Sequence, residues 1–174
     1  RDFSLEPTGV TILDLAKEKG MNVTAVGKIE DIFEHRGMTC TDHTTNNNDG
    51  IEKTIQYAKE EFEGILFTNL VDTDMIYGHR NDVDGYAEAI SAFDSWLAEF
   101  LAGLGEDDVV IITADHGCDP GFKGTDHTRE YVPFILYGEN IEPKNMGTIK
   151  VFDYISQQIK NLLIRVSKVY PNQP

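Results

Sequence analysis

Three polar clusters in the second half of the sequence combine aspartate and histidine side chains. Residues 72–80 read DTDMIYGHR, residues 115–120 read DHGCDP, and residues 124–130 read GTDHTRE. Three of the five histidines of the chain lie in these clusters, each with an aspartate no more than five positions before it. Carboxylate oxygens and imidazole nitrogens together form a mixed ligand set that borderline and hard divalent metals accept. The clusters therefore predict a divalent metal site.

Each cluster taken alone also has a simpler structural explanation. Asp74 and His79 could form only a loop ion pair, Asp115 could cap a helix that follows its strand, and residues 125–128 could form a polar turn. The pair Asp115 and His116 is the stronger case for a site, because it directly follows a β-branched strand. The three clusters together favour metal binding over these alternatives.

Charge and composition exclude several classes of partner. The chain has 30 Asp and Glu against 15 Lys and Arg, a formal net charge of -15, which argues against binding to nucleic acid or to an anionic membrane surface. No stretch approaches the roughly 18 apolar residues of a membrane span, and no leader pattern opens the sequence, so we expect a cytoplasmic protein. Cys40 and Cys118 form no CxxC pattern and are expected to be reduced thiols. Asp14 and Asp94 fall on predicted helices and are expected on solvated faces.

The clusters lie within an alternating pattern of strands and helices. Apolar, β-branched runs predict buried strands at 22–26, 64–71, 109–114 and 131–137, and Pro133 indicates an edge or a bulge in the last of them. Apolar residues at 3.6-residue spacing predict helices at 11–19, 50–61, 85–104 and 151–166, and residues 29–33 are predicted to form a short helical turn. Residues 36–50 are predicted to be a loop, with Asp49 as the N-cap of the following helix.

This order of elements predicts a mostly parallel, doubly wound α/β sheet with helices on both faces. Ligands of such sheets bind outside the carboxyl ends of the strands. The clusters at 72–80 and 115–120 follow predicted strands directly, so they fall at this edge.

In order and spacing, the clusters resemble the C-terminal motifs of the phosphopentomutase family, within the alkaline phosphatase superfamily. The similar runs are residues 69–80, 112–120 and 124–133, together with 26–29 and 48–50. The resemblance covers about residues 1–137 and is loose in the tail after Gly138. It implies an alkaline-phosphatase-like core of which residues 1–174 form the C-terminal part, without the N-terminal core segment and the cap domain.

The resemblance also implies a centre of two divalent metal ions, usually Mn²⁺. One metal would be bound by Asp115 and His116, and the other by Asp74, His79 and His127. Lys28 is similar to a family lysine that contacts the substrate phosphate. The family has a non-ligating residue at the position of Cys118. One aspartate ligand of the family belongs to the N-terminal segment, so the site at Asp115 and His116 is predicted to be the weaker one.

The implied reaction interconverts ribose 1-phosphate and ribose 5-phosphate, or their deoxy forms, through a phosphothreonine intermediate. Two cations suit this chemistry because they stabilise the entering and leaving oxygens of an in-line displacement, and they reconcile an acidic chain with an anionic pentose phosphate. The family's threonine nucleophile also belongs to the N-terminal segment, so this chain alone is predicted to be inactive. The expected protein partner is the missing N-terminal half or a second copy of the chain.

Two other hypotheses stay open at this point. The chain could be a non-catalytic metal-binding or partner module derived from the enzyme. It could also belong to another phosphoryl enzyme of the superfamily, such as a cofactor-independent phosphoglycerate mutase or a phosphatase. The runs at 77–80 and 126–130 favour the pentomutase. The sequence does not distinguish manganese from zinc or magnesium.

Overall fold

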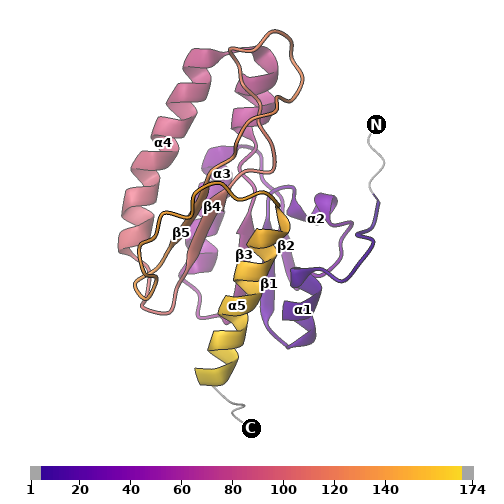
Figure 1. The fold of residues 1–174 in the computed structure, drawn as a ribbon, viewed down its shortest axis with the longest axis vertical. Helices are drawn as coiled ribbons and strands as arrows, with labels where there is room; N and C mark the ends of the chain where they lie inside the picture. Colours follow the sequence, from indigo (N-terminus) through magenta and orange to yellow (C-terminus); the bar gives the residue numbers. More distant parts are fainter. Residues whose placement is uncertain (1–4, 170–174) are drawn as a thin grey trace. The chain divides into compact units, whose positions relative to one another are not determined.

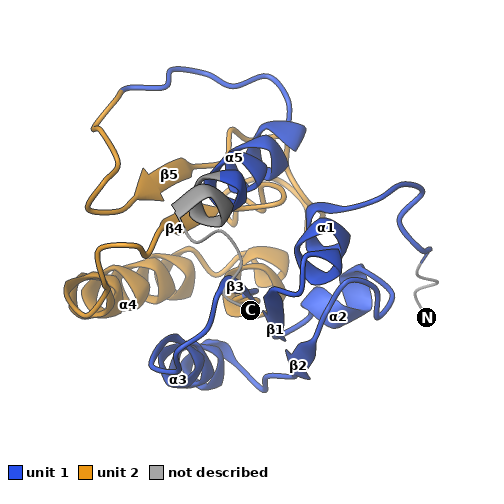
Figure 2. Cartoon of the chain, turned by 90° about the horizontal axis from the view of Figure 1, so that it is seen from below, with its two compact units in different colours: residues 1–69, 145–174 blue, residues 70–144 orange. Residues whose placement is uncertain are grey.

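The computed structural model describes residues 5–169, and only the backbone of 165–169. The chain divides into two compact units (Figure 2): unit 1 comprises residues 1–69 and 145–174, and unit 2 comprises residues 70–144. No helix in the described part of the chain is long and apolar enough to cross a membrane.

Three parallel strands form the sheet of unit 1. They are β1 (Asn22–Val26), β2 (Cys40–Asp42) and β3 (Gly64–Thr68), in the order β2-β1-β3. The strand predicted at 22–26 is confirmed, and the strand predicted at 64–71 ends earlier, at Thr68. The prediction of a continuous loop over 36–50 is wrong, because β2 pairs there with β1. At three residues, with a polar composition, this edge strand is too short for an alternation pattern to reveal it.

The described residues of unit 1 contain four helices: α1 (Ile12–Glu18), α2 (Ile29–Ile32), α3 (Asn47–Ala58) and α5 (Asp153–Val169). The predicted N-cap of α3 is wrong. Asn46 is the cap, since its side-chain oxygen accepts a hydrogen bond from Asp49 N at 3.0 Å. Asp49 lies within the first turn, where its carboxylate accepts a hydrogen bond from Thr45 N at 2.8 Å. The two side chains thus satisfy backbone donors on both sides of the helix start.

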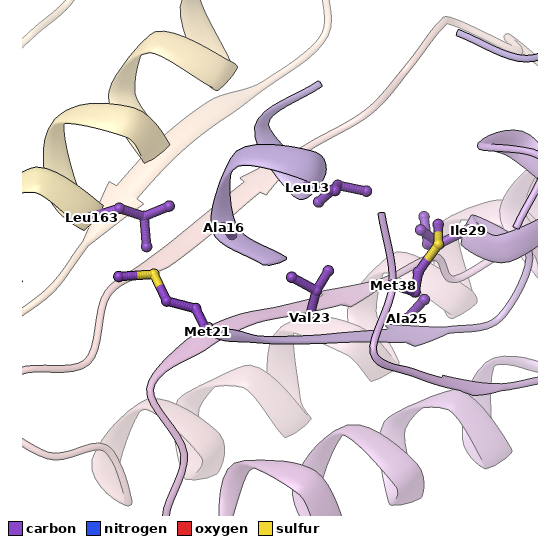
Figure 3. Packing of buried hydrophobic residues seen from close by; sticks show 8 residues of the cluster. All are labelled: Leu13, Ala16, Met21, Val23, Ala25, Ile29, Met38 and Leu163. Atoms are coloured by element: carbon purple, nitrogen blue, oxygen red, sulfur yellow. The ribbon is translucent and has the colours of Figure 1, made fainter. Parts of the chain in front are cut away.

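Helices cover both faces of this sheet. Val23 and Ala25 point to the face that α1 covers, and they share a buried cluster with Leu13, Ala16, Met21, Ile29, Met38 and Leu163 (Figure 3). Leu163 brings α5 into this cluster, and α5 runs beside α1 (Figure 1). On the other face, Thr54 of α3 hydrogen-bonds Thr68 of β3, with 2.8 Å between the hydroxyl oxygens. The predicted α/β class, with a parallel sheet between helices, is confirmed.

The expectation that Asp14 lies on a solvated face is wrong. Its carboxylate forms a capping box with Thr11 and accepts two hydrogen bonds from Arg36, at 3.1 and 2.9 Å. The same guanidinium donates to the carbonyl oxygens of Pro7 and Gly9. Burial alone would raise the pKa of Asp14, but the hydrogen bonds from Thr11 and Arg36 outweigh it and lower that pKa. Asp14 therefore ties the start of α1 to the segment before it.

Unit 2 holds one long helix, two short helical turns and a strand pair. Its elements are η1 (Thr73–Tyr77), η2 (Gly78–Arg80), α4 (Val83–Ala102), β4 (Val110–Thr113) and β5 (Phe134–Tyr137). β4 and β5 are antiparallel, so the parallel arrangement is found in unit 1 only. β5 begins just after Pro133, which cannot donate a ladder hydrogen bond. No residue of α4 is buried, although much of this described helix is apolar.

Candidate metal centre

The turn between β3 and α4 carries the first two site residues. Asp74 lies in η1, a π-helical turn, and His79 lies in η2, a 3₁₀ turn. Asp74 Oδ1 is 3.3 Å from His79 Nε2. Asn81 ends η2 in the left-handed conformation, with φ 55°. Single π-helical turns are rare and occur frequently at functional sites.

The loop between β4 and β5 supplies His116 and His127. An isolated antiparallel bridge joins Gly117 to Thr128, and Thr128 N donates to Gly117 O at 2.9 Å. The bridge brings the rings of His116 and His127 into a stack, with 3.7 Å between their centroids. A side chain at Gly117 would place its Cβ 2.6 Å from Glu130 Cβ, so this close approach requires glycine.

The carboxylate of Asp74 is the point where these two segments meet. Its Oδ1 also lies 3.3 Å from His127 Nε2. This oxygen is buried and has no hydrogen-bond partner among the described residues. His79 Nδ1 is paired with the carbonyl oxygen of Thr125, which can only accept, so Nδ1 carries a proton. In the neutral ring, the lone pair of His79 Nε2 is then on the side of Asp74, an arrangement that fits a bound cation.

Two groups of ligand atoms could each hold one ion. Asp74, His116 and His127 form one group, and Asp74, His79 and Cys118 form the other; within each group the ligand atoms lie within 4.8 Å of one another. Burial raises the pKa of the Cys118 thiol, and the neighbouring Asp74 carboxylate raises it further. The thiol is therefore protonated at neutral pH when no cation is near.

Two predicted site residues, Asp115 and Lys28, belong to neither of these groups. Asp115 is 71% exposed, and its Oδ2 lies 3.5 Å from His116 Nε2. Lys28 belongs to unit 1, where it follows the carboxyl end of β1 as the N-cap of α2, with an exposed side chain. The structure thus gathers Asp74, His79, His116 and His127, and it leaves Asp115 on the exposed rim.

Two residues near the centre were not singled out from the sequence. The Asn81 side-chain amide nitrogen lies within hydrogen-bonding distance of three carbonyl oxygens, those of Pro120, Phe122 and Gly124, at 2.8–3.2 Å. It thereby fastens the loop that carries the histidines to the turn that carries Asp74. Burial is the main cause of the raised pKa of Tyr86 in α4. The nearby groups of Cys118, Asp74 and Asp119 raise this pKa further. Asparagine adopts the left-handed backbone conformation more often than most residues do. Its position directly after His79 and Arg80 was therefore a signal in the sequence for a turn that ends in this conformation.

Comparison with known proteins identifies relatives over nearly the whole chain. The model of the metalloenzyme superfamily matches residues 14–165. Curated proteins named phosphopentomutase are similar: the one from Acetivibrio thermocellus is 53% identical over 164 residues, that from Lachnoclostridium phytofermentans 55% over 159, and that from Carboxydothermus hydrogenoformans 52% over 162. These matches cover 94%, 91% and 92% of this chain.

The resemblance to phosphopentomutases is thereby confirmed, and it extends past residue 137 into the tail. The chain spans only 42%, 41% and 42% of the length of these three relatives. The names favour the pentomutase hypothesis over a phosphoglycerate mutase, a phosphatase or a non-catalytic module.

Proposed function

The chain belongs to the metalloenzyme superfamily, and we propose that it is the C-terminal, metal-binding part of the catalytic core of a phosphopentomutase. The complete enzyme would interconvert (deoxy)ribose 1-phosphate and (deoxy)ribose 5-phosphate through a phosphothreonine. The observation that carries this proposal is the buried, unpartnered Oδ1 of Asp74, 3.3 Å from the Nε2 atoms of His79 and His127. The names of the relatives supply the reaction.

In this proposal the centre binds two divalent ions, and Mn²⁺ is the proposed metal. Asp115 and His116 hold one ion, while Asp74, His79 and His127 hold the other. When bound, the two ions would offset the charge of the phosphate and stabilise the entering and leaving oxygens of the displacement. The carboxylate and imidazole donors fit such ions, and the 3.5 Å between Asp115 Oδ2 and His116 Nε2 supports their pairing.

The protein's own groups orient this centre. The Thr125 carbonyl accepts the Nδ1 proton of His79 and so keeps Nε2 available. Asn81 holds the loop that carries His116 and His127. Lys28 provides a positive charge for the substrate phosphate, and its place after the carboxyl end of β1 supports this role. No threonine of this chain is assigned as the nucleophile, so the chain alone is expected to be inactive.

The proposal includes a protein partner that covers unit 2, either the N-terminal half of the enzyme or a second copy of the chain. Support comes from α4, which buries no residue although its Phe93, Trp96 and Phe100 rings pack against one another. The net charge of -15 supports the absence of a nucleic-acid partner. The two free cysteines, Cys40 and Cys118, support a location in the reducing cytoplasm.

A chimera tests this function. This chain replaces the matching segment of the Acetivibrio thermocellus phosphopentomutase, and conversion of ribose 1-phosphate to ribose 5-phosphate is measured with Mn²⁺. We expect the chimera to turn over substrate and the 174-residue chain alone to show no turnover. In the chimera, Asp74→Asn should reduce kcat/KM by about 100-fold or more, since it removes a ligand. Glu52→Gln, at an exposed position of α3 in unit 1, is the matched control and should leave turnover unchanged.

Three results would contradict the proposal. A folded chimera that binds Mn²⁺ but converts no ribose 1-phosphate would indicate a non-catalytic metal-binding module. A chimera that acts on 3-phosphoglycerate instead would indicate the other branch of the superfamily. Turnover of ribose 1-phosphate by the 174-residue chain alone would mean that a nucleophile lies within it.

A further inference from the structure

The thiol of Cys118 lies among the proposed metal ligands. Cys118 is 6% exposed, and its Sγ, a carboxylate oxygen of Asp74 and a ring nitrogen of His79 all lie within 4.8 Å of one another. Metal–ligand bonds are about 2.0–2.3 Å long, so two ligands on opposite sides of one ion are separated by about 4.0–4.6 Å. The three atoms are therefore close enough to share an ion with little movement.

Gly78 fixes the sulfur in this place. A side chain there would put its Cβ 2.5 Å from Cys118 Sγ and 3.0 Å from Cys118 Cβ, closer than packed atoms allow. The turn that carries His79 therefore packs directly against the sulfur because residue 78 is glycine. Asp74 and His79 belong to this same turn, so the thiol and the two other donors are held as one group.

The chemistry of this group differs from that of the group proposed for Mn²⁺. Both sets contain Asp74 and His79, but the third donor is an imidazole in one, His127, and a thiol in the other, Cys118. Hard cations such as Mn²⁺ prefer oxygen and nitrogen ligands, whereas thiolates favour Zn²⁺ and other borderline or soft ions. The identity of the third donor would thus depend on the ion.

We propose that Asp74, His79 and Cys118 form a site for a borderline divalent ion such as Zn²⁺ or Co²⁺, which competes there with Mn²⁺. When such an ion binds, the Cys118 thiol releases its proton to solvent, and the sulfur forms a bond to the metal in place of a bound water. This inference rests on the metal centre of the proposed function, but not on its mutase reaction.

Cobalt spectroscopy of the 174-residue chain tests the sulfur–metal bond directly. The metal-free chain is titrated with Co²⁺, and we expect a thiolate-to-cobalt charge-transfer band in the near ultraviolet. Cys40→Ser is the matched control: Cys40 is exposed, lies in unit 1, and is the other cysteine of the sequence. The band should persist in Cys40→Ser and disappear in Cys118→Ser and Cys118→Ala, with circular dichroism reporting that the variants are folded.

Competition titrations test the selectivity. Cys118→Ser should weaken Zn²⁺ binding by about 10- to 100-fold, while Mn²⁺ affinity should change by less than about threefold. An equal loss for both ions would overturn the inference, since it would make Cys118 a packing residue only.

Failure of this inference is distinguishable from failure of the metal centre itself. If Co²⁺ binds to the wild-type chain without a charge-transfer band, Cys118 is not a ligand and the inference fails, while the metal centre stands. If neither Co²⁺ nor Mn²⁺ binds to the folded chain, the inference and the proposed metal centre both fail.

Discussion

The two units of this chain differ in what holds them together. Among the described residues, every buried hydrophobic residue except Cys118 belongs to unit 1. Unit 2 contains the five gathered side chains of the candidate metal centre, and its one buried hydrophobic residue, Cys118, lies among them. Apolar burial stabilises the first unit. The second relies on turns, backbone bridges and polar contacts around Asp74.

This difference predicts that a bound cation stabilises unit 2 and not unit 1. In unit 2, Asp74 Oδ1 is a buried carboxylate oxygen without a hydrogen-bond partner, which is unfavourable because its lost hydration is not replaced by a hydrogen bond. A cation at that oxygen would remove the penalty and join the segments that carry the ligands. Unit 1 does not require a cation for its stability, since its buried hydrophobic residues already form a packed core.

The largest expected effect on stability lies in the core of unit 1. Leu13 is 1% exposed, and Leu13→Ala should lower the free energy of unfolding by about 2–5 kcal/mol, because it removes buried methyl groups and leaves a cavity. Leu5, at 86% exposure, gives a matched control, and Leu5→Ala should change it by no more than about 0.5 kcal/mol. Urea denaturation followed by circular dichroism measures both. Equal effects of the two substitutions would contradict the account of the core.

The next effect concerns metal binding by unit 2. Asp74→Asn should weaken Mn²⁺ binding at the proposed site of Asp74, His79 and His127 by about 100-fold, measured by titration calorimetry, because it removes the carboxylate of that ligand set. The same variant should leave the metal-free chain at least as stable as the wild type, since a neutral amide is less costly to bury than a carboxylate whose Oδ1 lacks a hydrogen-bond partner. A large loss of stability without metal would mean that Asp74 serves packing rather than binding.

Two substitutions of Asn81 distinguish the effect of its side-chain contacts from the effect of its backbone conformation. Asn81→Ala removes the contacts to three carbonyl oxygens and places alanine at φ 55°, so it should destabilise the chain by about 1–2 kcal/mol. Asn81→Gly also removes the contacts but tolerates the backbone angle, and it should cost less. Both variants should weaken Mn²⁺ binding by about tenfold in calorimetry. Unchanged affinity in both would show that the loop is held by other contacts.

The smallest effect is a pH dependence in unit 1. The pKa of Asp14 is lowered in the folded chain, so its stabilising contribution is fully present above the unfolded value of about 3.9 and is lost as the pH falls through the folded pKa. Asp14→Asn should therefore be less stable than wild type by about 1 kcal/mol at neutral pH. This difference should shrink below about pH 4 in urea titrations at several pH values. A difference that is constant down to pH 2 would contradict it.

The sequence predicted best what depends on local pattern. The β-branched run of β1, between Gly20 and Gly27, has the expected bounds. The spacing of aspartates and histidines predicted residues that the fold gathers at Asp74. β2 was missed because a polar strand of three residues is too short to show an alternation of polar and apolar residues. Its place is set by pairing with β1. The places of Asn81 and Cys118 depend on how two distant segments meet, which spacing along the chain does not encode.

Hydrogen exchange with and without Mn²⁺ tests the central claim most directly, because it reports on both units in one experiment. We predict that Mn²⁺ slows exchange in peptides that cover residues 72–81 and 115–128, and leaves exchange in β1 and α1 unchanged. Protection spread equally over both units, or no protection in the folded chain at Mn²⁺ concentrations that saturate related sites, would contradict a metal centre built around Asp74.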